Sequence, residues 1–220
     1  IFIPGVGAHY EVTPWLGVLA GVHSGFSPVP PNTSNTQADA ERSINYELGA
    51  RFQRGETRAE LIGYFSDYSN ILGRCTGSAG CPVEQIDAEA NGGSAWVYGL
   101  EASAEHTQNI RPLSVQAKMT YTLTQSQFRQ DFEADFGLFA GASVGDRLAY
   151  VPEHQGQLRL TAFTLDWDFS ASLSFGTEMF DTPAANRDET LVPDAYAVVD
   201  VAASYTVVPG GDIYGRIDNL

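Results

Sequence analysis

Long hydrophobic runs and positive charge are scarce in this 220-residue sequence. No run of 18 or more apolar residues occurs, which excludes a membrane-spanning helix. A membrane is not thereby excluded, because a spanning β-strand needs only about 9–11 residues of alternating character. Only 12 basic residues oppose 27 acidic ones, and the net charge is −15. Nucleic acid and the anionic face of a bilayer are therefore poor partners for this chain.

Cysteine is also scarce, with two residues in the whole chain, Cys75 and Cys81. Both lie in GRCTGSAGCP, whose Gly, Ser and Pro residues predict a loop. A zinc site would need four ligands, and no His is close in sequence. We predict a disulfide, which implies an oxidising compartment. The alternative is a pair of free thiols in a cytosolic loop.

What the sequence does contain is alternation with a period of two. In RSINYELGARFQRGE, residues 42 to 56, one side of an extended chain carries Ile44, Tyr46, Leu48, Ala50 and Phe52. Polar residues and glycine occupy the positions between them. The same rhythm recurs in PLSVQAKMTYTLTQ, DWDFSASLSFG, VYGLEASAEH and AVVDVAASYTV. It predicts strands that have one apolar and one polar face. In the segment from 57 to 72, Ile62, Tyr64 and Tyr68 interrupt the pattern.

Ten strands are predicted from this pattern. Their approximate ranges are 4–12, 15–25, 42–54, 57–72, 95–106, 112–126, 147–162, 166–178, 195–207 and 212–220. Short connections alternate with long ones, and the long ones fall at about 26–41, 73–94, 127–146 and 179–194. In an up-and-down antiparallel sheet, this places every long loop at one end. Brief turns at one end and long loops at the other are typical of outer-membrane β-barrels.

Two soluble architectures compete with the membrane barrel. Strands of a soluble sandwich are usually about 5–6 residues long, shorter than most of those predicted here. Greek-key connections would also break the alternation of short and long loops. A lipocalin-like barrel would turn the apolar face inward around a ligand. The pattern favours an all-β transmembrane barrel whose apolar face contacts lipid and whose polar face lines the lumen.

Several stretches resemble the barrel of TonB-dependent outer-membrane receptors, in particular the ferric dicitrate group. The main ones are PGVGAHYEVTPWLGVLAGVHSGFSPVPP, ERSINYELGARF, AELIGYFSDYSNILGRCTGSAGC, NGGSAWVYGLEASAEH, LAYVPEHQGQLRL and YAVVDVAASYTV. They occur in family order over nearly the whole chain. The closing RIDNL is similar to the segment that leads into the last strand of such barrels.

The resemblance implies a barrel of 22 strands with a plugged lumen. Because the last family strand runs inward, residues 1–220 are expected to form strands 12 to 21, the C-terminal part of the barrel. Loops 26–41 and 73–94 would close over the captured ligand. The plug, the TonB box and the remaining strands are expected to belong to a longer protein. The implied function is TonB-energised uptake of a ferric chelate, ferric citrate or a siderophore, across the bacterial outer membrane, with no catalysis and no cofactor.

Ligand candidates follow from the chemistry of ferric citrate, an anion that suits arginine forks and amide donors. Arg74, Gln85 and Asn91 share the loop 73–94 and are the first candidates. Arg42 and Arg129, beside two other long loops, follow them. The alternative for each residue is ordinary solvation or a surface ion pair.

Acidic residues complicate the choice of chelate. Two long loops carry Asp131, Glu133, Asp135, Asp181, Asp188 and Glu189, which would repel a naked anion. The chelate is therefore expected to be neutral or cationic if it is not citrate. The acidic spacing matches no defined metal-binding loop, and no metal site is predicted.

Charged residues on the polar face have two explanations. The set comprises Glu47, Arg51, Arg58, Glu60, Glu101, Glu105 and Arg159. Pairing between neighbouring strands is the simpler expectation. The alternative is contact with a plug domain.

Two further functions are compatible with parts of the strand pattern. A passive outer-membrane porin would share the alternation but would have no plug domain or TonB box. An omptin-like protease has ten strands and could recruit His23, His154 and Asp67 on paper. The sequence does not resemble that family, and a strand histidine is more often packed than catalytic. The chain is therefore not expected to be an enzyme.

Overall fold

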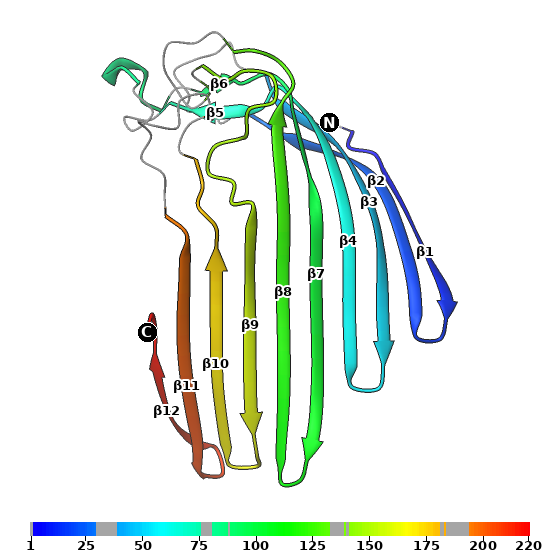
Figure 1. The fold of residues 1–220 in the computed structure, drawn as a ribbon, viewed down its shortest axis with the longest axis vertical. Helices are drawn as coiled ribbons and strands as arrows, with labels where there is room; N and C mark the ends of the chain where they lie inside the picture. Colours follow the sequence, from blue (N-terminus) through cyan, green and yellow to red (C-terminus); the bar gives the residue numbers. More distant parts are fainter. Residues whose placement is uncertain are drawn as a thin grey trace.

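The computed structural model describes residues 2–29, 39–75, 81–87, 89–132, 139, 141–180, 183 and 194–220. Ten long strands follow one another along the chain: β1 (Gly5–Thr13), β2 (Leu16–Ser27), β3 (Glu41–Arg54), β4 (Thr57–Ser69), β7 (Ala95–Ile110), β8 (Leu113–Phe128), β9 (His154–Phe163), β10 (Trp167–Gly176), β11 (Tyr196–Val208) and β12 (Gly211–Ile217). They form a single antiparallel sheet whose spatial order is their order in the sequence (Figure 1). The predicted all-β, up-and-down architecture is confirmed.

Two short strands and one helical turn interrupt the connection between β4 and β7. Strands β5 (Leu72–Arg74) and β6 (Glu89–Asn91) pair with each other and form a separate two-stranded sheet. Between them lies the 3₁₀ turn η2 (Val83–Gln85). Within the described residues, no helix has the length and apolar character needed to cross a membrane.

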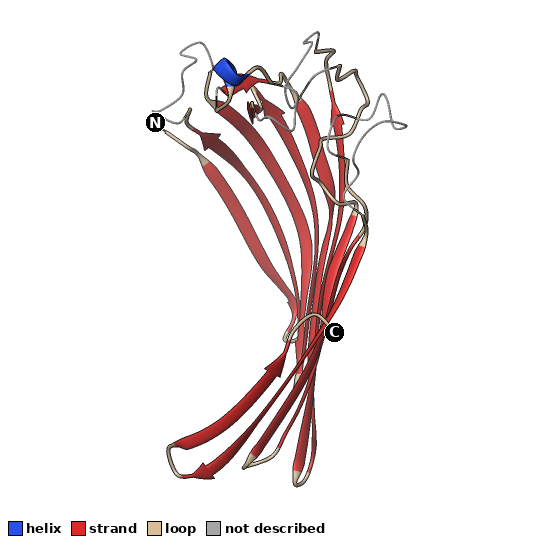
Figure 2. Ribbon diagram, turned by 90° about the vertical axis from the view of Figure 1, so that its left-hand side faces the viewer, coloured by secondary structure: helices blue, strands red, loops and turns tan. Residues whose placement is uncertain are grey.

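The long strands form a curved layer with unequal ends (Figure 2). At one end they are joined by tight turns, and at the other by long connections (Figure 1). The long connection between β4 and β7 carries both β5 and β6. Gly55 and Gly210 occupy two of the tight turns with φ of +56° and +85°, a conformation that is strained for other residues. The alternation of short and long connections that the sequence predicts is therefore present in the structure.

The strand registers sort the side chains into two faces. Residues that pair across an antiparallel ladder point to the same side of the sheet. Leu48 pairs with Gly63, and Leu61 pairs with Ala102. We call this side the apolar face. The intervening residues, such as Glu47, Glu101 and Thr122, share the other side, which we call the polar face.

Tyr64 shows why the pattern between 57 and 72 looks irregular. Strand β4 pairs on both sides without a bulge, so Ile62, Tyr64 and Tyr68 all lie on the polar face. The Tyr64 ring extends past Gly99 on β7, and its hydroxyl lies 2.9 Å from Thr124 Oγ1 on β8. A Cβ on Gly99 would overlap the Leu123 carbonyl oxygen, so this close approach requires glycine. The aromatic ring covers the gap that the glycine leaves.

Four strand ends lie three or more residues from prediction, and one of them is β12, which stops at Ile217 rather than at residue 220. Residues 147–153 do not extend β9, because Pro152 has no N–H for a ladder and Tyr150 has a φ of +59°. Strand β4 stops at Ser69, where Asn70 adopts a φ of +54°. Strand β7 continues through the predicted turn to Ile110, since residues 107–110 still pair with β8.

Buried apolar residues are few in the described part of the chain. Most large apolar side chains of the sheet remain exposed, among them Leu48 at 69% and Phe169 at 52%. Buried hydrophobic side chains gather at the long-loop end, where Ile71, Ala95, Phe128, Phe139 and Ala142 form one cluster. The middle of the sheet thus has no core of its own.

Candidate functional site

The long-loop end, which we call the rim, is the only part of the sheet with a local core among the described residues. Phe139 contacts Phe128 and Phe132 edge-to-face, with ring centroids 5.8 Å apart in both pairs. Gly73 on β5 and Gly92 after β6 lie against the same ring, because a Cβ on either would overlap it. Ring and glycines together fasten the β5–β6 hairpin to the connection between β8 and β9.

The hairpin lies over polar-face positions. Ala95 and Phe128 pair with each other across β7 and β8, in register with polar-face residues, and both are buried by the loop residues. Part of loop 73–94 therefore packs against the polar face at its rim end. A ligand that enters along this face would meet the hairpin.

Asn91 joins two of the long loops. Its Oδ1 accepts a hydrogen bond from the Asp39 N–H at 2.6 Å, and its Nδ2 donates to the Asp39 carbonyl at 2.8 Å. Nδ2 also donates to the Asn70 carbonyl at 3.0 Å. Glu41 adds a second link by accepting a hydrogen bond from the Leu72 N–H at 3.0 Å. The amide of Asn91 is thus occupied within the protein, in holding the end of loop 26–41 to the hairpin.

Arg74 is the exposed cation of the hairpin. Its guanidinium lies 3.8 Å from Asp87, a long contact, and more than half of its side chain is exposed. This is the only ion pair of Arg74 with the described residues, and no side-chain hydrogen bond of Arg74 is found among them. Gln85 lies in η2 on the same loop. Cys75 and Cys81 form a disulfide with Cα atoms 5.8 Å apart, which closes the loop beside Arg74.

Arg42 and Arg129 are placed differently from Arg74. Arg42 belongs to the apolar face of β3, in the same alternation as Ile44 and Tyr46. Arg129 Nη1 donates a hydrogen bond to Asp67 Oδ1 at 2.9 Å, and its guanidinium lies 4.8 Å from the centroid of the Trp96 ring. Asp67 and Trp96 pair with each other in register with Ile44, so this group also lies on the apolar face. The five predicted candidates therefore separate into two groups.

A second polar group lies where β9 begins. Arg147 donates to Glu153 at 2.8 Å, and Gln125 also donates to this carboxylate. The hydrogen bonds from Arg147 and then Gln125 lower the pKa of Glu153 below its ordinary value. The next residue, His154, places Nδ1 2.7 Å from the Tyr121 hydroxyl.

Charges on the polar face pair across strands where the structure describes them. Arg51 Nε donates to Glu60 at 2.6 Å between β3 and β4, and Gln116 donates to Glu105 at 3.3 Å between β7 and β8. His23 Nε2 lies 3.8 Å from Glu47. These contacts are those expected of neighbouring strands.

Neither a metal centre nor a protease-like cluster is assembled in the described part of the chain. No group of three or more His, Cys, Asp or Glu side chains has a metal-binding arrangement there. Glu133, Asp135, Asp181, Asp188 and Glu189 lie outside the described residues. His23 is on the polar face, whereas Asp67 and His154 are on the apolar face, so these three residues do not meet.

A long up-and-down sheet with one apolar face, tight turns at one end and a loop-built rim at the other defines a portion of an outer-membrane-type β-barrel. The family described as "TonB dependent receptor-like, beta-barrel" matches residues 1–220, and the chain belongs to it. This family consists of receptors and transporters of the outer membrane, which agrees with the expectation that the chain is not an enzyme. The comparisons give no support to a passive porin.

Curated relatives cover nearly all of the chain at low identity. The metal-pseudopaline receptor CntO of Pseudomonas aeruginosa is 22% identical over 222 residues, which span 99% of this chain and 29% of the receptor. The ferric enterobactin receptor PirA of the same species is 24% identical over 203 residues, or 84% of this chain and 24% of the receptor. The chain thus spans less than a third of the length of these relatives.

Solved structures give the same fold. The ferric citrate transporter FecA in its unliganded form superposes with a TM-score of 0.69 at 17% identity, over 99% of this chain and 33% of that one. The ferric yersiniabactin uptake receptor FyuA of Yersinia pestis gives a TM-score of 0.69 at 20% identity, over 98% and 31%. Because both scores are equal, the fold does not single out the ferric dicitrate group within the family.

Proposed function

We propose that this chain is part of an outer-membrane receptor that binds a metal chelate of the ferric siderophore or ferric citrate class and imports it with energy from TonB. The proposal rests on one main observation. A loop hairpin, fastened by Phe139 and Asn91, lies at the mouth of a polar sheet face whose reverse side is apolar. The chelate receptors among its relatives add support by analogy.

The apolar face is proposed to contact the hydrocarbon of the outer membrane. On β3 this face runs from Arg42 to Arg54, and the positions between them are Ile44, Tyr46, Leu48, Ala50 and Phe52. Twelve residues of strand span about 40 Å. At a tilt of about 40°, this is about 30 Å along the membrane normal, the thickness of the hydrocarbon core. The two arginines thus bracket an apolar band of the right height.

The chelate site is proposed on the rim side of the polar face. Arg74 would contact the chelate directly, because its guanidinium is exposed and only loosely paired with Asp87. Gln85 stays a candidate on the same loop, although its side chain lies outside the described part of the structure. Asn91 would act by positioning, since its amide already holds Asp39 and Asn70. Arg42 and Arg129 lie on the opposite face and are not part of this site.

The charge of the rim argues against a bare ferric citrate anion. Asp39, Asp87, Asp131 and Asp146 lie in the rim loops, with Arg74 as the exposed cation of the hairpin. Because like charges repel across a desolvated mouth, a neutral or cationic chelate fits this surface better. Residues 1–220 would then supply strands 12 to 21 of a 22-stranded barrel. The plug and the TonB box would lie elsewhere in the full-length receptor.

The test is binding and uptake by the full-length receptor. Affinities for ferric citrate, a ferric catecholate and a ferric hydroxamate would be measured by intrinsic fluorescence quenching. We expect one chelate to bind, its affinity to fall at least about tenfold in Arg74→Gln, and its uptake to require TonB. Lengthening the tight turn at Gly55 and Glu56 by two residues is the control, because that turn lies at the opposite end of the sheet. Binding that survives replacement of both loops 26–41 and 73–94 would refute the site.

A further inference from the structure

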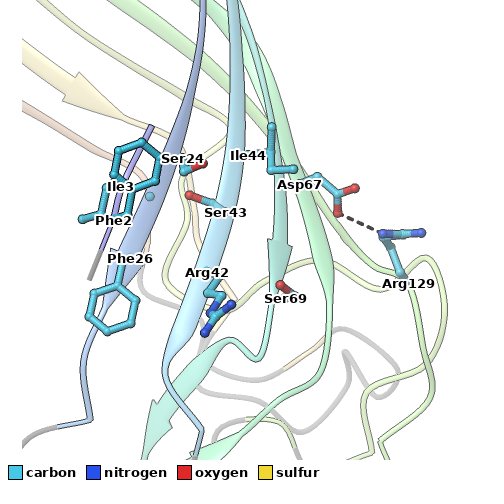
Figure 3. Close-up of a pocket in the computed structure, with 11 residues that line it drawn as sticks. Phe2, Ile3, Ser24, Phe26, Arg42, Ser43, Ile44, Asp67, Ser69 and Arg129 are labelled. Carbon is cyan, nitrogen blue, oxygen red and sulfur yellow. Dashed lines mark hydrogen bonds and ion pairs between the residues drawn. The ribbon is translucent and has the colours of Figure 1, made fainter. Parts of the chain in front are cut away.

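An unusual charged pocket opens on the apolar face, just below the rim. Figure 3 shows Arg42 and the Asp67–Arg129 pair along its lining, together with Phe2 and Phe26. The pocket has a volume of about 600 Å³. The side chain of Arg42 makes no hydrogen bond or ion pair with any residue that the structure describes. Two arginines and one aspartate leave a local positive charge in a chain whose net charge is −15.

Aromatic rings lie beside this pocket, on the side facing the middle of the sheet. Arg129 stacks on Trp96, which lies 5.8 Å from Phe65, and Phe65 in turn stacks on Tyr98 at 6.3 Å. Tyr46 adds a further contact with Phe65 at 6.1 Å. Amphipathic rings at this depth are typical of the boundary between hydrocarbon and headgroups.

An apolar groove continues from the aromatic rings toward the middle of the sheet. It is lined on the apolar face by Leu48, Leu61, Gly63, Phe65, Tyr98 and Leu100 and has a volume of about 960 Å³. Gly63 forms its floor, because this residue has no side chain between Leu48 and Leu100. A Cβ there would meet Leu100 at 3.5 Å, an ordinary contact, so the backbone does not require glycine. The glycine instead leaves the groove open.

Pocket and groove occupy successive apolar-face positions of the same two strands. On β3 the apolar-face positions run Arg42, Ile44, Tyr46, Leu48, and on β4 they run Asp67, Phe65, Gly63, Leu61. Each strand therefore has a charged residue nearest the rim and a leucine nearest the middle of the sheet, with an aromatic residue between them. This order matches the profile of one lipid molecule, from headgroup to acyl chain.

We propose that this surface binds an anionic lipid whose phosphate lies between Arg42 and Arg129 and whose acyl chain fills the groove over Gly63. The proposal rests on the membrane placement proposed above and extends it to a specific site. A guanidinium fork suits phosphate, and the geometry of Arg129 is held in advance by Asp67 and Trp96. Arg42, with no competing partner among the described residues, supplies the second fork.

Native mass spectrometry of the full-length receptor in detergent tests this site with phosphatidylglycerol as the probe. We expect one molecule to be retained, and dioleoylglycerol, which has the chains but no phosphate, to be retained at least about tenfold less. Arg42→Gln should lower phosphatidylglycerol occupancy about tenfold, and Gly63→Leu should lower it by filling the groove. Arg54→Gln, on the same face of β3 at the opposite end, is the matched control and should have no effect.

Several results would overturn the proposal. Equal retention of dioleoylglycerol would reduce the site to non-specific apolar contact, and displacement by 10 mM inorganic phosphate would make it a site for a free anion. An equal loss of phosphatidylglycerol retention in Arg42→Gln and Arg54→Gln would show that any arginine on this face is sufficient to bind the lipid. Arg42 has no described partner to leave unpaired, so the unfolding midpoint of Arg42→Gln should match wild type. The assay uses no ferric chelate, so its failure is distinct from failure of the proposed transport function.

Discussion

The middle of the sheet and the rim differ in whether the chain itself buries their apolar side chains. In the middle, Leu48, Leu61 and Phe169 are half or more exposed, and no described loop covers them. At the rim, Phe128 and Phe139 are almost fully buried beneath loops. The rim is thus organised like a small soluble domain with a core of its own. On the proposed placement in the outer membrane, the middle would depend on an apolar medium outside the chain, as expected for a sheet that spans a bilayer.

This difference separates stability that comes from packing from stability that comes from the surroundings. Changes at the rim should alter local order and depend little on lipid. Changes on the apolar face should be felt only in a membrane. Three substitutions with control variants, and one pH titration, test this division.

The largest effect is expected from Phe139→Ala. Loss of this ring removes the contacts to Phe128, Gly73 and Gly92, at a cost of about 3–5 kcal/mol in local stability. Hydrogen exchange of the hairpin should accelerate, while exchange in the middle of β7 and β8 should not change. Leu165→Ala, a substitution of a 98% exposed residue in a tight turn, is the control. Unchanged protection of residues 71–74 would contradict the packing role of the ring.

A charge in the middle of the apolar face should come next. Leu48→Arg should destabilise the full-length barrel in phospholipid vesicles by about 2–4 kcal/mol, because the guanidinium would lie near the bilayer midplane. Thr120→Arg, on the polar face at an exposed position of β8, should cost far less. Urea titration in vesicles measures both. Equal losses for the two variants would mean that the apolar face does not meet lipid.

Asn91→Ala should have a smaller, local effect. It removes three hydrogen bonds that join Asp39 and Asn70 to the hairpin, at a cost of about 1–3 kcal/mol. Faster hydrogen exchange is expected at residue 39 and in β5. Asn109→Ala, which removes one hydrogen bond at the opposite end of the sheet, should leave that exchange unchanged. If the rim exchanges at the wild-type rate without the Asn91 amide, this residue does not hold the loops together.

The smallest effect concerns Glu153 and pH. Arg147 and Gln125 lower the pKa of this partly buried carboxyl in the folded protein, so its ionised form favours folding. The resulting stability is present above the unfolded pKa of about 4.5 and is lost as the pH falls through the lower folded pKa. Glu153→Gln should therefore be less stable than wild type at neutral pH, and the two proteins should become equally stable in acid. NMR titration of Glu153 measures the pKa directly, and an unshifted value would contradict the role of Arg147.

Sequence reasoning succeeded where side chains alternate without interruption. The faces of β3, β8 and β10 follow from period two alone, because a register slip of one residue would reverse every side chain. It failed where local backbone chemistry decides. Tyr150 and Pro152 delay the start of β9 to His154, and Asn70 ends β4, although the flanking residues favour strands.

The candidate site was less accessible to sequence reasoning than the sheet. Position in a long loop suggested five polar residues, but it did not distinguish the rim from the apolar face. Asn91 meets Asp39 across 52 residues of chain, and Arg129 meets Asp67 across 62. The one available signal was the two-residue alternation along the strand. Arg42 continues the alternation of Ile44 and Leu48 and so belongs to the apolar face.

The amino-acid sequence by itself determined the strands, their order and the sorting of apolar from polar side chains, because these depend on near neighbours and a two-residue period. Only the tertiary structure decided that Phe139 closes a core over β7 and β8, that Asn91 joins two loops, and that Arg42 and Arg129 share a pocket. These contacts bring together residues that are distant in the chain, and loop closure between them leaves no periodic trace in the sequence.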